Sequence, residues 1–328
     1  MKFVRGSVSL VLIAAALVVL ALAYGAFWDR SRPSTTVNVV ITSGASFDQV
    51  LLTLRRDGVI AHALPLHVLA RIQGDERRVR AGEYRFAPHE SEAEILQTLI
   101  TEGAAVARWV TIPEGFTDAQ IAGRLQAAGI GNARTLADAF ASGSIVVGGA
   151  RTKSLEGFLF PDTYLMPLDA TPAQIEQQME RAFMAALPRD ASRRARALHL
   201  SVPQIVTVAS LVEREAKVER DRPLIAGVIY HRLRLGMPLQ IDATIEYVLP
   251  KHKSELTESD LAIASPYNTY LHAGLPPTPI ANPGAASLEA AFYPAATKAL
   301  YYVYCGGGRH VFADTLAEHR ANVARCLP

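Results

Sequence analysis

Residues 201–218 read SVPQIVTVASLVEREAKV, and this stretch predicts the central helix of a globular domain. Ser201 is a suitable N-cap residue, and the proline two positions later is tolerated in the first turn of a helix. At about 100° per residue, the apolar side chains at 205, 208, 209, 212 and 216 fall on one face. Because such a stripe avoids water, we expect this face of the helix to be buried in the core.

Two carboxyl groups lie near the end of this predicted helix. Glu213 and Glu215 fall about 80° to either side of the apolar stripe, so we expect them to point away from each other. They are therefore poorly placed to act as the paired carboxyl groups of a standard glycosidase, which flank one bond. A single carboxylic acid at the edge of an apolar stripe suits proton donation, since partial burial favours the neutral form. The competing interpretation is a salt-bridged helix edge, with Arg214, Lys217 or Arg220 as the partner.

The segments around this helix predict two domains of unequal size. A small α+β module is expected from strands at 37–41 and 81–86 and from helices that begin after Ser46 and span 64–73 and 91–101. A new strand at 109–112 places the domain boundary near residue 107. The larger domain is predicted to be mixed α/β, with helices at 117–128, 135–142, 171–187, 203–218, 223–235 and 287–292, strands at 300–304 and 310–312, and a last helix from residue 315.

The N-terminal segment predicts a membrane anchor. No charged residue occurs from Gly6 to Trp28, and these 23 residues are long enough to cross the hydrocarbon core of a bilayer. Lys2 and Arg5 precede the run, which favours a cytoplasmic N-terminus and an exported remainder. The alternative is a cleaved signal peptide, because the sequence Ala-Leu-Ala at 21–23 resembles a cleavage site.

Composition and motif content exclude several classes of protein. Lys and Arg number 33 against 31 Asp and Glu, and a net charge of +2 gives no indication of a nucleic-acid-binding surface. No HExxH, GxSxG or P-loop motif occurs, which argues against a metalloprotease, a serine hydrolase of that type and an NTPase. We expect no metal and no cofactor, so acid–base chemistry by carboxyl groups remains. The spacing of Cys305 and Cys326 leaves open whether they form a disulfide.

Several separated motifs resemble one known family. They are TIPEGFT at 111–117, LEGFLFPDTY at 155–164, ASLVEREA at 209–216, VIYHRLRLGMPLQIDATIEYVL at 228–249, SPYNTYLHAGLPPTPIANPGAASLEAAFYPA at 265–295 and YYVYCGGGRHVFADTLAEH at 301–319. With them, the chain resembles the YceG-like family of membrane-anchored endolytic murein transglycosylases from about residue 37 to residue 325. One departure lies in LQIDAT, where the family more usually has LQTDPT, so that Ile241 and Ala243 replace Thr and Pro.

The resemblance implies an organisation for the whole chain. Together with the N-terminal run, it implies a cytoplasmic segment, a single transmembrane anchor in the inner membrane, a linker, a LysM-like subdomain that helps to hold glycan, and a periplasmic catalytic domain. These parts are expected at 1–6, 7–28, 29–36, 37–106 and 107–328, respectively. A plain α+β spacer is the alternative for the LysM-like part. Peptidoglycan glycan strands and, as partners, peptidoglycan synthases are also implied.

The resemblance further implies a lytic reaction at one carboxyl group. The bond cleaved would be the MurNAc-β-1,4-GlcNAc bond of nascent glycan strands, with 1,6-anhydroMurNAc ends as products and a limit on strand length as the result. The family's catalytic glutamate is carried onto Glu213. This residue would donate a proton to the bond oxygen and then accept one from the C6 hydroxyl, which attacks C1 in place of water.

Six downstream residues are expected to contact the sugar: Gln240, Asp242, Thr244, Tyr267, Asn268 and Tyr270. The first three alternate along LQIDATIEY and, on an extended segment, would present polar groups from one face. The last three lie in a proline-rich irregular stretch at 265–283, and such a stretch inside a compact domain is usually functional. A polar strand edge and a loop packed for structural reasons are the respective alternatives.

Four further predictions concern supporting residues. We expect Glu215 to be structural, because it points away from Glu213. We expect His310 to be structural, and Glu156 to pair with an arginine or to cap a turn. Gly274, with the prolines at 276 and 277, is expected to shape the backbone.

Two other functions compete with the lytic one. A hydrolytic muramidase would need a second carboxyl group, which Asp242 or Glu156 could supply, and its products would carry reducing ends. A non-catalytic, membrane-tethered cell-wall scaffold would need no acid at all, and the presence of Glu213 within its motif argues against it.

Overall fold

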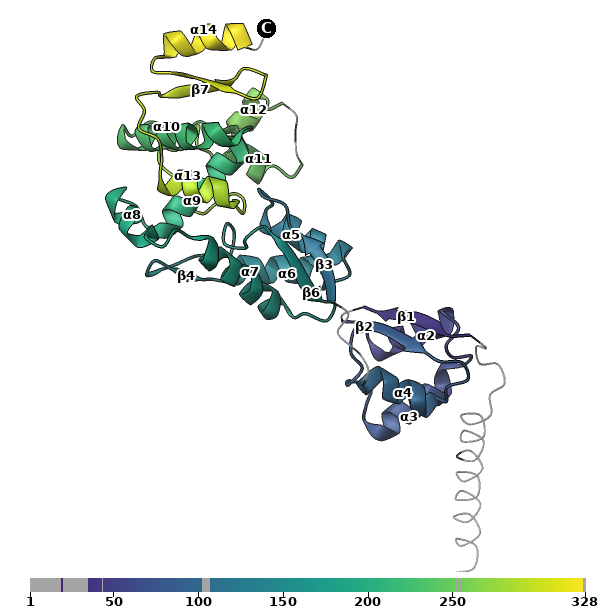
Figure 1. Ribbon diagram of the computed structural model, residues 1–328. Helices are drawn as coiled ribbons and strands as arrows, with labels where there is room; N and C mark the ends of the chain where they lie inside the picture. Colours follow the sequence, from purple (N-terminus) through teal and green to yellow (C-terminus); the bar gives the residue numbers. More distant parts are fainter. Residues whose placement is uncertain are drawn as a thin grey trace, which may run out of the picture. The chain divides into compact units, whose positions relative to one another are not determined.

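The computed structural model describes residue 19 and residues 35–42, 44–101, 107–251, 253 and 255–326 (Figure 1). The chain divides into two compact units. Unit 1 comprises the described residues up to Trp109, with Ala128–Gly131 and Leu165–Ala170. Unit 2 comprises Val110–Ala127, Asn132–Tyr164 and the described residues from Thr171 onward. The elements are a mixture of helices and small two-stranded sheets, so the predicted α+β class is confirmed.

The predicted N-terminal segment at 1–6, most of the linker at 29–36 and the predicted anchor at 7–28, apart from residue 19, lie outside the described residues. Within the described part of the chain, no single helix is long and apolar enough to cross a membrane. One bent pair of helices, α8 (Ala191–Ala197) and α9 (Val202–Glu215), passes the same test on length and composition alone. The anchor and the domain ranges therefore stay predictions.

Between residues 35 and 101, the described part of unit 1 forms two antiparallel strands and three helices, which the sequence predicts to within two residues. They are β1 (Val37–Ile41), α2 (Phe47–Arg56), α3 (Ala63–Gln73), β2 (Gly82–Phe86) and α4 (Glu92–Thr101). Ser46 caps α2 in a capping box with Gln49, which satisfies backbone N–H groups that the first turn leaves free. Leu54, Leu66 and Phe86 are fully buried between the strands and the helices. The unit therefore has its own apolar core.

Unit 2 is organised around α9, as the sequence predicts. Ser201 and Gln204 form a capping box at its start. The predicted apolar stripe is buried, and so are residues on the other faces, such as Thr207 and Ser210. This wider burial arises because several helices pack against α9: α8, α10 (Arg222–Arg234), α11 (Asp242–Val248) and α13 (Ala285–Phe292).

The end of α9 differs from the prediction in a way that matters for the site. The helix was predicted to continue to residue 218, but it ends at Glu215, and Ala216 takes up an extended backbone conformation. A short 3₁₀ helix, η1 (Glu219–Asp221), then leads directly into α10. Residues Glu213 and Glu215 therefore lie in the last turn, next to an open helix end.

Further short elements complete the structure. The helices are α5 (Asp118–Ala127), α6 (Ala133–Ser142), α7 (Pro172–Ala186), α12 (Glu258–Leu261) and α14 (Leu316–Cys326). The strands pair as β3 (Ala107–Thr111) with β6 (Thr163–Pro167), β4 (Val146–Val147) with β5 (Ala150–Arg151), and β7 (Tyr301–Tyr304) with β8 (His310–Ala313). Seven elements of the structure were not predicted from the sequence: α8, α11, α12, β4, β5, β6 and η1.

The segment LQIDATIEY is not extended, which corrects the prediction. Helix α11 begins at Asp242, with Ile241 at the N-cap position. The Thr244 hydroxyl donates a hydrogen bond to the Ile241 carbonyl at 2.7 Å. An acidic residue in the first turn is favourable because it faces the positive end of the helix dipole. The proline-rich stretch at 265–283, by contrast, contains neither helix nor strand, as predicted.

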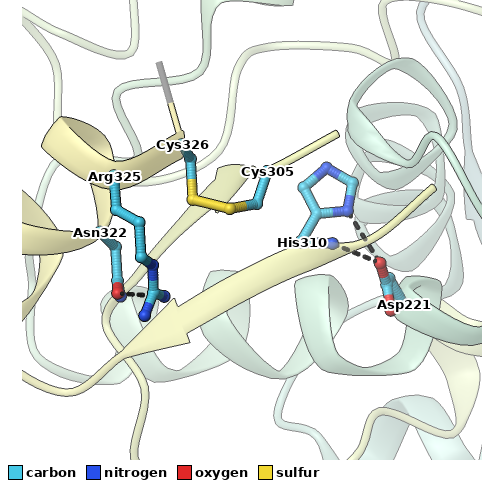
Figure 2. Close-up of a disulfide and its surroundings, with 6 residues drawn as sticks. All are labelled: Asp221, Cys305, His310, Asn322, Arg325 and Cys326. Atoms are coloured by element: carbon cyan, nitrogen blue, oxygen red, sulfur yellow. Dashed lines mark hydrogen bonds and ion pairs between the residues drawn. A yellow bond between two sulfur atoms is a disulfide. The ribbon is translucent and has the colours of Figure 1, made fainter. Parts of the chain in front are cut away.

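The β7–β8 hairpin and α14 are joined covalently. Cys305, which follows β7, forms a disulfide with Cys326 at the end of α14 (Figure 2). The question that the sequence left open is thereby answered. On its other side, the hairpin contacts the end of η1, because Asp221 Oδ2 accepts hydrogen bonds from the backbone N–H and the Nδ1 of His310 (Figure 2). The structural role predicted for His310 agrees with this contact.

Candidate active site

A cavity of about 490 Å³ lies at the end of α9. Its walls come from α9, from the loop after β3, from α11 and from the β7–β8 hairpin. Five carboxyl groups line it: Glu114, Glu213, Glu215, Asp242 and Glu246. We call it the carboxyl cavity. Glu213 and Glu215 both line this cavity, although their spacing on α9 predicts that they point away from each other. The reason is that α9 ends at Glu215, and the cavity extends around the helix end.

Glu213 is held by an ion pair. Its Oε2 accepts a hydrogen bond from Arg222 Nη1 at 3.2 Å and another from the backbone N–H of Gly284 at 3.1 Å. The Arg222 Nη1 also donates to the Ser287 hydroxyl. Only 8% of the Glu213 side chain and 11% of the Arg222 side chain are exposed. Glu213 therefore connects α9 to the starts of α10 and α13, by an ion pair with Arg222 and a hydrogen bond from Gly284.

Glu215 has different surroundings, although it is only two residues away. Burial raises the pKa of its carboxyl to about 7. The Tyr302 hydroxyl donates a hydrogen bond to Oε2 at 2.9 Å, which opposes this rise in pKa, while the negative charge of Asp242 adds to it. At neutral pH, a substantial fraction of Glu215 therefore carries a proton. This is the property that a general acid needs.

Glu114 was not singled out from the sequence, although it lies in the TIPEGFT motif. It lines the carboxyl cavity, and burial, with a further contribution from the charge of Glu213, raises its pKa. Its carboxylate lies so close to Gly284 that a Cβ atom at Gly284 would come within 1.9 Å of Glu114 Oε1. The absence of a side chain at Gly284 therefore allows Glu114 and Glu213 to occupy the same corner of the cavity.

Three of the six residues predicted to contact sugar lie at cavities beside Glu215. Asp242 lines the carboxyl cavity and also a second cavity next to it, and Gln240 and Tyr270 line the second one. The Tyr270 hydroxyl donates a hydrogen bond to Asp242 Oδ1. Gln240 has a φ of 52°, a conformation that is uncommon for a residue with a side chain, and its backbone N–H bonds the Thr269 carbonyl. The structure thus brings these three residues together.

The other three make contacts within the fold, and Tyr267 is half-buried. Thr244 and Asn268 are fully buried. The Asn268 side-chain amide donates to the carbonyls of Leu261 and Ile263, at 2.9 and 2.8 Å. The Tyr267 hydroxyl lies 2.7 Å from that of Thr278. These contacts correspond to the alternative interpretation, in which the polar groups hold the irregular stretch in shape.

Glu156, a candidate for a second catalytic carboxyl, lines neither cavity. It is buried beside Asp118, and its carboxylate accepts from the Asp118 backbone N–H. Burial raises the pKa of Glu156 well above its usual value and that of Asp118 to about 7. The amide of Asn282 donates to the Asp118 carboxylate at 3.0 Å and to the Phe116 carbonyl at 3.0 Å. This network joins the loop that carries Glu114 to the loop that carries Gly284.

Among the described residues, no group of three or more His, Cys, Asp and Glu is placed to hold a metal ion. The chemistry available at the carboxyl cavity is proton transfer by carboxyl groups, at a site where negative charges can stabilise a positive centre. A half-buried acid with a raised pKa, beside other carboxyl groups and tyrosines, is typical of an enzyme of the acid–base class.

Comparison with known proteins narrows this class. The family model described as the YceG-like family matches residues 39–325, and the chain belongs to this family. An endolytic murein transglycosylase of Bacillus subtilis (strain 168) is 32% identical over 306 residues, which cover 87% of this chain and 83% of the relative. An endolytic murein transglycosylase of Streptococcus pneumoniae serotype 2 is 31% identical, and the match covers 88% of this chain and 58% of the longer relative. The crystal structure of a yceG-like protein from Listeria monocytogenes, 31% identical, has a TM-score of 0.59 and covers 88% of this chain and 99% of that one.

Proposed function

We propose that the protein is an endolytic murein transglycosylase that cleaves the MurNAc-β-1,4-GlcNAc bond and leaves 1,6-anhydroMurNAc ends. The observation that carries the proposal is a half-buried, partly protonated carboxyl group beside a polar cavity, in a chain 32% identical to an endolytic murein transglycosylase over most of its length. A transglycosylase needs one carboxyl group that first donates and then accepts a proton, because the substrate's own hydroxyl replaces water.

The geometry favours Glu215 as this acid. The sequence resemblance assigns the role to Glu213, and that assignment stays a prediction. Glu213, however, already accepts hydrogen bonds from Arg222 and from the Gly284 backbone, and both are donors that match a carboxylate. The pKa of Glu215 is raised to about 7, and its partner is a neutral hydroxyl. Of the two, Glu215 is the better proton donor near neutral pH.

The proposed reaction has two proton transfers and consumes no water. Glu215 protonates the glycosidic oxygen as the bond to C1 breaks, and the negative charges around the cavity, Asp242 among them, stabilise the positive charge that develops on the sugar. The ionised Glu215 then takes the proton of the C6 hydroxyl while the oxygen of that hydroxyl forms a bond to C1. Glu215 ends the cycle protonated, as it began. The Tyr302 hydroxyl orients the carboxyl group throughout.

The cellular setting is part of the proposal. Residues 7–28 would anchor the protein in the inner membrane by a single span, with unit 2 outside it and nascent glycan strands as the substrate. Unit 1 would act as the LysM-like module that keeps glycan near the membrane, and peptidoglycan synthases would be partners. Cleavage close to the site of synthesis would limit strand length.

The test compares three purified full-length proteins on isolated peptidoglycan: the parent, Glu215→Gln and Glu213→Gln. Mass spectrometry of the products should find anhydro ends with the parent and with Glu213→Gln, and none with Glu215→Gln. If only Glu213→Gln loses these ends, the role belongs to Glu213.

Two further outcomes correspond to the alternative functions. Reducing ends instead of anhydro ends would indicate a muramidase. The alternative has structural support in that Asp242 lines the same cavity as Glu215 and could serve as its second carboxyl group. No cleavage by the parent would favour a tethered scaffold.

A further inference from the structure

A second cavity, of about 420 Å³, lies beside the carboxyl cavity. Glu215, Asp242, Tyr302 and Val303 line both cavities, so that Glu215 lies at the wall between them. A volume of this size falls within the range of small-molecule sites, roughly 300–1,000 Å³. We call it the α14 cavity, because α14 forms part of its wall through Leu316, His319 and Val323.

Helix α14 packs on the β7–β8 hairpin. It has 11 residues, and none of them is buried. Its contacts are with the β7–β8 hairpin, where the His319 ring stacks on Tyr301 with the ring centroids 5.1 Å apart. The Cys305–Cys326 disulfide fixes its far end to the same hairpin (Figure 2). Because a helix of this length without a buried residue is marginal by itself, the hairpin contacts and the disulfide together keep α14 at the cavity.

The chemistry of the α14 cavity is amphipathic. Gln240 and Asp242 supply polar groups on one side, while Leu316 and Val323 supply apolar groups on the helix side. An N-acetylhexosamine has matching properties, because it combines hydroxyl and amide groups with apolar C–H faces and an acetyl methyl group. The cavity can satisfy both at once.

The charges at the α14 cavity argue for a neutral ligand and against an anion. Arg232 lines the cavity, but its guanidinium donates to the carbonyls of Leu300 and Leu239 at 2.6 and 2.7 Å, so that its hydrogen bonds are directed into the protein. Burial, and next the charge of Arg232, lower the pKa of His319, which favours its neutral form. Asp242 adds a negative charge. A sugar without a phosphate or carboxylate fits these surroundings best.

We propose that the α14 cavity is a saccharide subsite and that α14, held by the Cys305–Cys326 disulfide, is its outer wall. The glycan then lies across both cavities, with the scissile bond at Glu215 between them. The position of the scissile bond at Glu215 rests on the proposed function. The binding of saccharide in the α14 cavity, however, can be measured without cleavage.

The experiment measures the binding of two probes to full-length protein by calorimetry: a β-1,4-linked N-acetylglucosamine hexamer and peptide-free glycan strands. Both are measured on the Glu215→Gln background, so that no cleavage occurs during titration. Adding Leu316→Ser and Val323→Ser removes the apolar wall and should weaken binding roughly five- to tenfold. Arg320→Ala, on the same helix and at an exposed position outside the cavity lining, is the matched control and should bind like its parent.

The disulfide is tested separately. A Cys305→Ser/Cys326→Ser variant should weaken binding to a similar extent, and thiol reductant should have the same effect on the protein with both cysteines but none on the double variant. Circular dichroism checks that each variant remains folded. Because the wall variant keeps both cysteines, it tests the subsite even if the serine variant does not fold.

The outcomes separate this inference from the proposed function. Unchanged affinity in the wall variant, equal loss in Arg320→Ala, or no binding of either probe would overturn the subsite. Binding with the expected losses, in a protein whose parent cuts no peptidoglycan, would leave the subsite standing and the proposed function refuted. If the parent cleaves peptidoglycan but the wall variant binds saccharide as before, the proposed function stands and the subsite is refuted.

Discussion

The two sides of the α9 helix end carry the same chemical group in opposite environments. Glu213 accepts hydrogen bonds from an arginine and from a backbone N–H, whereas the half-buried Glu215 accepts one from a tyrosine hydroxyl. Neither environment comes from α9 itself. The first is supplied by the starts of α10 and α13, and the second by the β7–β8 hairpin. The comparison teaches that the role of a carboxyl group is set by the segments that reach it and not by its position on the helix.

The largest expected effect is the loss of turnover in Glu215→Gln. Because a positioned general acid and base contributes roughly 10²–10⁴-fold, we expect kcat on glycan strands to fall by that factor. Glu213→Gln should reduce kcat about tenfold or less, since it weakens a positioning contact only. Glu246→Gln, in the same cavity, is the control for a lost negative charge. A larger loss in Glu213→Gln than in Glu215→Gln would reverse the comparison.

A smaller expected effect concerns stability and the Glu213 side alone. Arg222→Met leaves a buried carboxylate without its cation, which should lower the free energy of unfolding by about 3–5 kcal/mol. Arg214→Met breaks the more exposed pair with Glu246, whose side chains are 35% and 24% exposed, and should cost less than about 1 kcal/mol. Urea unfolding followed by circular dichroism measures both. An equal loss in the free energy of unfolding for Arg222→Met and Arg214→Met would mean that the Glu213–Arg222 pair is not buried in solution.

The smallest expected effect is a displacement of the pH–rate profile. With a folded pKa of about 7, Glu215 loses its proton as the pH rises, so kcat should fall as the pH passes about 7. The Tyr302 hydroxyl lowers this pKa, because it donates to the ionised carboxylate. Tyr302→Phe should therefore raise the pKa and move the fall in kcat to higher pH.

Tyr304→Phe is the control, since it alters another tyrosine of the same strand that lines the carboxyl cavity. A displacement to lower pH in Tyr302→Phe, or an equal displacement in both variants, would count against the assignment of Glu215 as the acid.

Local sequence signals predicted most of the elements correctly. The capping residues Ser46 and Ser201 each precede a helix whose apolar spacing is clear, and both helices begin where expected. The segment LQIDATIEY was wrongly predicted to be extended, because it is too short for the spacing of its residues alone to distinguish a strand from a helix. Its polar residues alternate as in a strand, and so do its buried apolar residues at 239, 241, 243 and 245, although the structure forms a helix there.

The candidate site was predictable only in part, and for a physical reason. The sequence identified the helix turn that borders the carboxyl cavity and three residues that line the cavities, Gln240, Asp242 and Tyr270. It could not assign the environments of Glu213 and Glu215, because the hydroxyl that bonds Glu215 belongs to Tyr302, 87 residues further along the chain. Glu114 and Arg222 were missed for the same reason, since their proximity to Glu213 arises only from tertiary packing.

The Asn282 network has a consequence for the order in which unit 2 folds. The Asn282 side chain makes hydrogen bonds to partners that are 123–166 residues away in sequence, and one of them, Phe116, lies in the loop that carries Glu114. Contacts of such high separation require large loops to close, and this entropy is lost before the contacts stabilise the chain. Helix α9 and its local caps can therefore form early during refolding, while the cavity at its end is completed late. Recovery of helical signal should precede recovery of activity.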